Sequence, residues 1–345
     1  MLPGVSPLAH APPGFFVVAR CADLGRGPLR VWFAGVPLVL FRSGLGVAAL
    51  VDACPHRGVA LSRGSVQHGH IHCPYHGYRY AASGVCVAMP GLGSGRAIPE
   101  ALRTPSLDCV EQQGFVWVRA APLSGQALPP RLPLFEDADV HTFCWPLQVQ
   151  GGLLDAIENF LDGTHTHYVH RGLIRTPKRR SPVSVAVLRE GLTVEARYTP
   201  APRRVSASSA GLLGVLLTRG IDGRIARFLA PAIGQLEYRR KDRAAMVLSA
   251  LFSPAQAGTV RAWAVVSTRS IPGVPDALVQ TLIRPLFKLA IAQDRRILRL
   301  QSEGRAQLPL HQDVLGPLDV MRPHMEHIAR HGGSALAAQE LTLWL

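Results

Sequence analysis

Two short clusters of cysteine and histidine stand out in the stretch "CPHRGVALSRGSVQHGHIHCPYHGYRY", residues 54–80. Cys54 and His56 enclose one residue; sixteen residues later, Cys73 and His76 enclose two. Two thiolates and two imidazoles are a ligand set for zinc or for an iron–sulfur cluster. Zinc fingers usually pair cysteine with cysteine and histidine with histidine. The mixed pairs favour a [2Fe–2S] cluster with two histidines on one iron, and zinc remains the alternative.

The residues that flank these four ligands support a cluster held by two matching loops. Each loop has a proline directly after its cysteine and a glycine just after its histidine: Pro55 and Gly58, Pro74 and Gly77. Proline stiffens a loop, and glycine gives it backbone freedom. The motifs "CPHRG" and "CPYHG" resemble the Rieske domain of Rieske non-heme iron oxygenases. Val59 and Tyr75 stand where Rieske proteins of respiratory complexes have an extra cysteine pair, so the oxygenase type is favoured.

A second constellation lies in "DAIENFLDGTHTHYVHRG", residues 155–172. Asp162 precedes His165 by three residues, and His170 follows His165 by five. Five residues correspond to about 140° on a regular helix, so a break near Gly163 is needed to bring both imidazoles onto one metal. Two imidazoles and one carboxylate form the open site of non-heme Fe(II) oxygenases.

The third ligand can come from a distant helix. Residues 277–303, "ALVQTLIRPLFKLAIAQDRRILRLQSE", predict a long helix that kinks or restarts at Pro285. Beyond this proline, four apolar residues predict one buried face: Leu286, Leu289, Ile297 and Leu300. Asp294 can point inward with that face, where a metal would satisfy its charge. The alternative is a surface ion pair with Arg295 or Arg296.

Both stretches resemble the catalytic domain of the same oxygenase family, through "ENFLDGTHTHYVHRG" and "AQDRRILRLQ". The resemblance runs from about Phe15 to Gln301. It implies that His165, His170 and Asp294 bind a mononuclear iron, and that Asn159 lies near it. Asp162 matches the family's bridging acid, which would connect His76 of one subunit to an iron-ligating histidine of the next. His167 is expected to lie outside the ligand set.

The elements that position these residues form two regions. From Phe15 to about Ala120, β-branched apolar runs alternate with Gly, Pro and Asp turns, which predicts a small antiparallel β-sandwich. Residues 121–140 are rich in proline and predict a connector. The expected class is α+β, with a Rieske [2Fe–2S] domain at 1–120 and a catalytic domain at 141–345. For the catalytic domain the resemblance implies a helix-grip-like fold, an antiparallel sheet around a long C-terminal helix.

Composition narrows the range of partners and compartments. The chain has 345 residues and a net charge of +14, carried mainly by arginine. It has no helix-turn-helix signature and no basic run interleaved with aromatic residues, so nucleic acid is not an expected partner. The charge could serve an acidic electron-transfer partner, or arginine-rich composition alone could explain it. Scattered cysteines, no basic leader and no apolar run of about 18 residues lead us to expect a cytoplasmic protein without a membrane segment.

The resemblance implies an oxidoreductase, the oxygenase component of a Rieske-type system, similar to the single-subunit homotrimeric demethylases and monooxygenases. The chain lacks a dinucleotide fingerprint, so a separate NAD(P)H-dependent reductase, perhaps with a ferredoxin, would supply electrons. We expect hydroxylation or oxidative demethylation of an apolar or aromatic substrate with O₂. Ring dihydroxylation and natural-product tailoring are alternatives at the same site. A Rieske electron carrier without oxygenase activity, and a zinc-containing nucleic-acid binder, are the rival classes.

Overall fold

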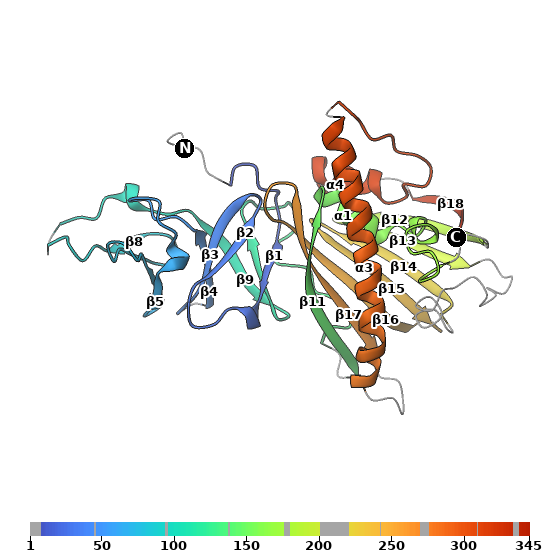
Figure 1. The fold of residues 1–345 in the computed structure, drawn as a ribbon, viewed down its shortest axis with the longest axis horizontal. Coiled ribbons are helices and arrows are strands. Elements are labelled where there is room, and N and C mark those ends of the chain that lie inside the picture. Colours follow the sequence, from blue (N-terminus) through green and yellow to red (C-terminus); the bar gives the residue numbers. More distant parts are fainter. Residues whose placement is uncertain are drawn as a thin grey trace. The chain divides into compact units, whose positions relative to one another are not determined.

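The computed structural model describes residues 8–44, 46–93, 96–136, 139–175, 180–200, 221–241, 243–269, 276–308, 310–333 and 338–345. The chain divides into two compact units. Unit 1 comprises Met1–Pro130 together with Ser253–Ala257. Unit 2 comprises Arg131–Phe252 and Gly258–Leu345. Figure 1 shows the elements of both units.

Unit 1 is built from two antiparallel sheets. Six strands pair in the order β1-β10-β9-β4-β3-β2, and four short strands pair in the order β5-β6-β7-β8. Their bounds are β1 Phe16–Arg20, β2 Leu29–Phe33, β3 Val36–Ser43, β4 Gly46–Val51, β5 Ser65–Gln67, β6 His70–His72, β7 Arg79–Tyr80, β8 Cys86–Ala88, β9 Ser106–Gln112 and β10 Phe115–Arg119. Valine is the most frequent residue of the larger sheet, and phenylalanine and tryptophan also occur in it, because branched and aromatic side chains suit a buried pleated surface. The small β domain expected from the sequence is confirmed.

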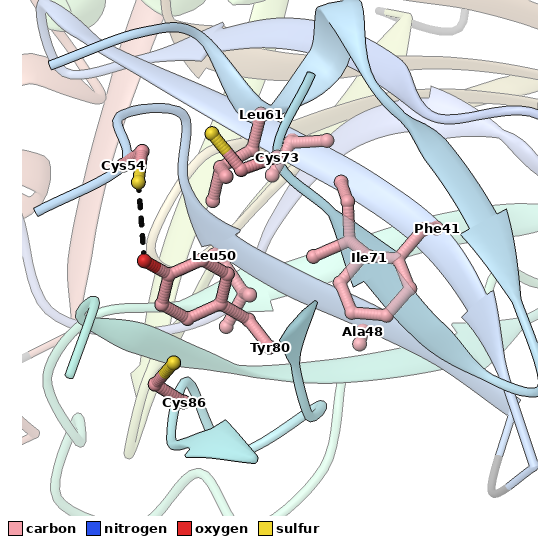
Figure 2. Packing of buried hydrophobic residues seen from close by; sticks show 10 residues of the cluster. Phe41, Ala48, Leu50, Cys54, Leu61, Ile71, Cys73, Tyr80 and Cys86 are labelled. Atoms are coloured by element: carbon pink, nitrogen blue, oxygen red, sulfur yellow. Dashed lines mark hydrogen bonds between the residues drawn. The ribbon is translucent and has the colours of Figure 1, made fainter. Parts of the chain in front are cut away.

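The core of unit 1 includes both cysteines of the first motif (Figure 2). Cys54 and Cys73 are each 3% exposed and pack with Leu61, Ile71 and Tyr80, which are fully buried. Truncating a buried Ile or Leu to Ala typically costs about 2–5 kcal/mol of stability. The two loops that carry the cysteines are therefore held in place by well-packed apolar side chains of the core.

Within the described residues, unit 2 contains an eight-stranded antiparallel sheet and three α-helices. The strand order is β11-β17-β16-β15-β14-β13-β12-β18. The strands are β11 Val140–Gln150, β12 Pro182–Glu190, β13 Thr193–Pro200, β14 Gly223–Leu229, β15 Ile233–Arg240, β16 Arg243–Pro254, β17 Thr259–Arg269 and β18 Gln339–Trp344. The helices are α1 Leu153–Leu161, α3 Asp276–Gln307 and α4 Arg322–His331. The sheet and its long C-terminal helix confirm the expected helix-grip-like arrangement (Figure 1).

Helix α1 lies directly on the sheet because a glycine makes room for it. Ala156, Ile157 and Leu161 form its buried face. A Cβ atom on Gly234 of β15 would come within 2.7 Å of Cδ1 of Phe160. Any side chain at position 234 would push α1 away from the sheet, and with it residues 162–170, which follow the helix.

Helix α3 corrects one expectation from the sequence. It continues through Pro285, so it does not restart there. Among the residues of this helix whose burial is described, Phe287, Ala290 and Leu298 are buried. Three of the four residues predicted to be buried are instead 40–50% exposed: Leu289, Ile297 and Leu300. The face was wrong because apolar residues occur on more than one side of this helix, and spacing alone could not identify the buried side.

Among the described helices, none combines the length and apolar character needed to cross a membrane.

Candidate metal centres

The two loops of the first motif have the same backbone hydrogen-bond pattern. Cys54 N–H donates to the carbonyl of the residue five positions ahead, at 2.9 Å, and its own carbonyl accepts from Gly58 N–H at 2.8 Å. Cys73 repeats this pattern at 2.8 Å, with Gly77 as the second partner at 3.1 Å. Gly58 and Gly77 have φ of 71° and 69°, which favour glycine. The repeated loop explains the matching Pro and Gly positions.

These loops bring like ligands together. His56 Nδ1 lies 3.2 Å from His76 Nδ1, whereas both thiols lie in the core beneath. Cys54 Sγ lies 3.1 Å from the hydroxyl of Tyr80, drawn as the dashed line in Figure 2. Burial raises the pKa of the Cys73 thiol, so a metal must displace its proton. Paired imidazoles above paired sulfurs fit a [2Fe–2S] cluster with histidines on one iron and cysteines on the other.

The second motif begins where α1 stops. Asp162 leaves the helix with extended backbone angles, φ −64° and ψ 133°. Its carboxylate accepts hydrogen bonds from Thr164 N–H at 2.7 Å and His165 N–H at 3.0 Å. These two bonds form an Asx-type turn, which is followed by a single 3₁₀ turn, His165–His167. The break near Gly163 that the sequence requires is therefore confirmed.

After this turn, three predicted residues converge. His165 Nε2 lies 3.2 Å from His170 Nε2. Asp294 Oδ1 lies 3.1 Å from His170 Nε2 and 3.5 Å from His165 Nε2. Asp294 Oδ1 is also buried without a hydrogen-bond partner. A buried carboxylate oxygen that faces two imidazole nitrogens fits the donor set of a cation, so these residues suit iron. Asp294 does not take the alternative role of a surface ion pair.

Each imidazole is oriented through its other ring nitrogen. Asp162 Oδ2 lies 3.3 Å from His165 Nδ1. Gln293 Oε1 lies 2.9 Å from His170 Nδ1. An acceptor at Nδ1 fixes the tautomer that leaves Nε2 free for a metal. Sequence reasoning missed Gln293, although its position directly before Asp294 places it on the same helix.

The carboxylates and imidazoles of this site shift one another's pKa values. Burial would raise the pKa of Asp294, but the close imidazoles of His165 and His170 lower it to about 2. Burial would likewise raise the pKa of Asp162, and His165 and Thr164 lower it to about 2. Burial opposes protonation of His165, yet the two carboxylates raise its pKa to about 9. Two ionised carboxylates around neighbouring imidazoles make a site that favours positive charge.

Asn159 lies on the wall of a cavity of about 340 Å³ next to Asp162. Residues of α1, α3, β13, β18 and the segment 318–321 line this cavity. Two further acids, Asp155 and Glu158, lie on the same wall. Arg322 binds both, at 2.9 Å from Asp155 Oδ1 and 2.9 Å from Glu158 Oε2. The cavity therefore has an acidic wall next to the proposed bridging acid.

The two acids respond differently to burial. Burial would raise the pKa of Asp155, but Arg305 and Arg322 lower it. For Glu158, burial outweighs Arg322 and raises the pKa to about 7. The folded state therefore holds the Glu158 proton more tightly than the unfolded state, whose Glu pKa is about 4.3. The stability that this gives is fully present below about pH 4.3 and is lost as pH rises to about 7.

At pH 8 we expect the free energy of unfolding of Glu158→Gln to be about 1–3 kcal/mol higher than that of the parent chain, because glutamine cannot ionise. This difference in the free energy of unfolding disappears near pH 4. Urea unfolding followed by circular dichroism measures the free energy of unfolding at both pH values. Asp155→Asn is the matched control with the opposite sign, a loss of about 3 kcal/mol at pH 8, since it leaves Arg305 and Arg322 underpaired. Lower stability of Glu158→Gln at pH 8 would contradict the assignment.

Comparison with known proteins agrees with the two-part fold. Residues 14–108 match the Rieske [2Fe-2S] domain, and residues 153–325 match the vanillate O-demethylase oxygenase C-terminal domain. The Rieske domain thus precedes the oxygenase C-terminal domain in this chain. The chain belongs to the Rieske non-heme iron oxygenases, in the group that has the vanillate O-demethylase type of catalytic domain. Its cofactors are accordingly a Rieske [2Fe–2S] cluster and a mononuclear iron.

Several curated relatives are oxygenases. The chain is 34% identical to the oxygenase component of dicamba O-demethylase from Stenotrophomonas maltophilia, over 47% of this chain and 48% of the relative. It is 32% identical to the 3-chlorobenzoate-3,4-dioxygenase oxygenase subunit of Comamonas testosteroni, over 44% and 35%. It is 31% identical to methylxanthine N3-demethylase NdmB of Pseudomonas putida, over 54% and 53%. The matches thus span about a third to a half of these relatives.

Solved structures share the fold over most of the chain. Dicamba monooxygenase bound to dicamba superposes with a TM-score of 0.73 at 21% identity, covering 92% of this chain and 97% of the other. Pseudomonas putida NdmA with caffeine gives a TM-score of 0.73 at 21% identity, covering 92% and 89%. At this identity the likeness establishes the architecture, and the reaction must be argued from the site.

Proposed function

We propose that the protein is the oxygenase component of a Rieske-type system that hydroxylates or oxidatively demethylates an aromatic or apolar substrate. The observation that carries the proposal is the convergence of His165, His170 and Asp294 around an unpartnered carboxylate oxygen. A protein that only carried electrons would not need this second site. Demethylase relatives support the reaction class, since dicamba O-demethylase and the methylxanthine demethylases remove methyl groups, as their names state.

In this proposal each metal centre has its own set of ligands. Cys54, Cys73, His56 and His76 hold the [2Fe–2S] cluster, and His165, His170 and Asp294 hold Fe(II). When bound, the iron supplies O₂ activation, and the cluster supplies an additional electron. Gln293 and Asp162 keep the two imidazole rings in the tautomer that binds metal. Asn159 is assigned to the same region from its place on the cavity wall beside Asp162.

The inner face of the sheet gives the substrate an apolar surface near the iron ligands. Trp145, Leu248 and Phe287 belong to a buried cluster that joins β11, β16 and α3. Ala290, one turn before Asp294, belongs to the same cluster. An apolar wall next to a reactive site excludes water and accommodates an aromatic body. The aromatic or apolar substrate is inferred from this surface.

We infer that Asp162 connects His165 to His76 of a second copy of the chain within a homotrimer. Asp162 contacts the ring nitrogen of His165 that faces away from the metal, and His76 is exposed on its loop. Apolar residues exposed on α3 and on the segment after it supply a surface that another subunit could cover: Leu289, Leu300, Leu310 and Val314. A separate reductase, with or without a ferredoxin, completes the electron supply from NAD(P)H.

We propose residues 1–120 as the cluster domain, 121–140 as a connector and 141–345 as the catalytic domain. Operation in the cytoplasm belongs to the same proposal. None of the six cysteines forms a disulfide bond, as expected for a reducing compartment: Cys21, Cys54, Cys73, Cys86, Cys109 and Cys144.

Turnover tests the function directly. The iron-loaded protein is supplied with NADH, a surrogate reductase and ferredoxin, and a panel of methoxylated and unsubstituted aromatic compounds. We expect O₂-dependent formaldehyde from a methoxylated compound, or a hydroxylated product, together with three irons per chain. Two irons per chain and no product with any compound would instead identify an electron carrier.

Cluster loss tests the first site. We expect Cys54→Ser to lose the red-brown colour of the protein, because one iron keeps too few thiolate ligands. Absorption spectroscopy and iron analysis measure the loss. Cys109→Ser, at a cysteine outside the motif, is the control and should retain the colour. A Cys54→Ser chain that is still coloured and reducible would overturn the Rieske ligand assignment.

A further inference from the structure

Tyr80 places a hydroxyl group inside the apolar core that carries the two cysteine loops. Its side chain is fully buried and belongs to the same core as Leu50, Ile71 and Cys86 (Figure 2). A phenylalanine would fill this space with the same ring and no polar atom. Because a buried hydroxyl without a hydrogen bond is costly, the hydroxyl of Tyr80 needs a partner.

The partner is the sulfur of Cys54. Tyr80 Oη lies 3.1 Å from Cys54 Sγ, as the dashed line in Figure 2 shows. Within the part of the chain that the structure describes, this sulfur is the only hydrogen-bond partner of the hydroxyl. A cysteine that binds metal is a thiolate and has no proton to give, so in the loaded protein the tyrosine O–H is the donor.

The position of Tyr80 in the fold directs this hydroxyl from one loop to the other. Tyr80 is on β7, opposite Ile71 of β6 and Cys86 of β8. Strand β7 follows the second cysteine loop, whereas Cys54 belongs to the first. Because paired strands hold the ring on both sides in a close-packed core, its hydroxyl stays aimed at the sulfur.

The other tyrosines of this segment contact the histidines instead. Tyr75 stacks on His76 with ring centres 3.9 Å apart, and Tyr78 stacks on His56 with ring centres 5.0 Å apart. Among the described residues, neither of these two hydroxyls is hydrogen-bonded to a proposed cluster ligand. Of the three tyrosines, Tyr80 is thus the one whose side chain gives a hydrogen bond to a ligand atom.

A hydrogen bond to a ligand sulfur affects the reduced cluster more than the oxidised cluster. Reduction adds one electron, which makes the thiolate sulfur more negative, and a donor then stabilises it more strongly. Cys54 and Tyr80 are both buried, so water screens this difference very little. The hydroxyl of Tyr80 therefore favours the state in which the cluster holds the electron.

We propose that Tyr80 raises the reduction potential of the [2Fe–2S] cluster through its hydrogen bond to Cys54. The inference rests on the proposed ligand set, and it adds a residue that acts on the cluster only through Cys54. The electron itself comes from the separate reductase. A higher potential makes electron uptake from the reductase more favourable and transfer to the mononuclear iron less favourable by the same amount. Tyr80 thus sets how the electron is divided between the two centres.

Tyr80→Phe removes the hydroxyl and keeps the ring. The full-length protein with both centres loaded is equilibrated under nitrogen, without substrate, with a one-electron redox dye of known potential, and the absorption of the cluster gives its reduced fraction. We expect the equilibrium constant for reduction to fall about tenfold, which is about 59 mV for a one-electron couple. Tyr78→Phe, which removes a hydroxyl from the same segment, is the matched control and should change this constant by less than about twofold.

A second variant covers the case in which Tyr80→Phe does not retain its cluster. Incorporation of 3-fluorotyrosine at position 80 leaves the size of the ring nearly unchanged and makes the hydroxyl a stronger donor. We expect the equilibrium constant for reduction to rise about twofold. A fall of this constant, or no change, would contradict the proposal.

The outcomes separate an effect on the potential from an effect on packing. If Tyr80 only fills the core, Tyr80→Phe changes the unfolding temperature and leaves the potential at the parent value, which overturns the proposal. An equal fall of the potential in Tyr78→Phe would also overturn it, since the bond to Cys54 would not be the cause. Because no substrate or O₂ is present, either failure leaves the proposed oxygenase function untouched, and the turnover assay tests that function separately.

Discussion

Asp294→Ala is expected to remove the mononuclear iron and leave the red-brown cluster unchanged. Asp294 faces His165 and His170 from a different element, and its inner oxygen has no other partner. Without it, two imidazoles remain, which is too few protein ligands for the two-histidine, one-carboxylate site. Loss of an outer-shell partner typically costs 10–100-fold in metal affinity or activity, so loss of a ligand should cost more than about 100-fold.

Iron content and absorption separate the two centres in this experiment. The expected result is two irons per chain, an intact cluster spectrum and product formation reduced at least about 100-fold. Glu303→Ala is the matched control, an exposed acid on the same helix that pairs with Arg299. Three irons per chain with normal turnover in Asp294→Ala would remove this residue from the ligand set.

Asp162→Asn is expected to keep both metals but to slow electron transfer between them. The carboxylate holds His165 through Nδ1, and its charge stabilises that imidazole. Asparagine keeps the shape but retains a single acceptor oxygen, so it cannot satisfy the turn and the ring together. With substrate and O₂, reoxidation of a prereduced cluster should slow by about two orders of magnitude or more, and product should fall equally.

Thr164→Val is the control for the local turn. It removes a hydroxyl that donates to Asp162 at 2.8 Å and leaves the charge in place. We expect normal cluster reoxidation in this variant. If Thr164→Val slows it as much as Asp162→Asn, the effect comes from the turn and not from the carboxylate. Unchanged reoxidation in Asp162→Asn would show that the acid only caps the turn.

Mixed assemblies test whether the path runs between subunits. A Cys54→Ser chain lacks the cluster, and an Asp294→Ala chain lacks the mononuclear iron. Coexpressed with different tags and purified as mixed trimers, they should recover part of the activity, because one chain supplies the cluster to the iron of its neighbour. Silent mixed trimers of confirmed composition would contradict the path from His76 to Asp162 of the next subunit.

The residues that we propose as ligands could be chosen from the sequence because metals require particular atoms at short spacing. The sequence alone shows the mixed Cys–His pairs and the Asp162–His165–His170 spacing. The break after α1 could also be predicted, since a regular helix cannot direct His165 and His170 to one point.

Other features depend on which residues meet across the fold. The buried side of α3 could not be chosen from periodicity, because leucine and isoleucine also occupy its exposed side. In the sequence Gln293 looks like an ordinary helix residue, and only the structure shows that its Oε1 lies 2.9 Å from His170 Nδ1.

The adjacency of Gln293 and Asp294 has a mechanical consequence. One residue orients a ring of the iron site, the next approaches both rings, and they belong to one rigid turn of α3. Phe287 and Ala290, on the same buried side, contact the surface proposed for the substrate. Any shift of this helix along its axis would displace the orienting amide and the carboxylate by the same amount. The geometry at the iron would then change as a unit.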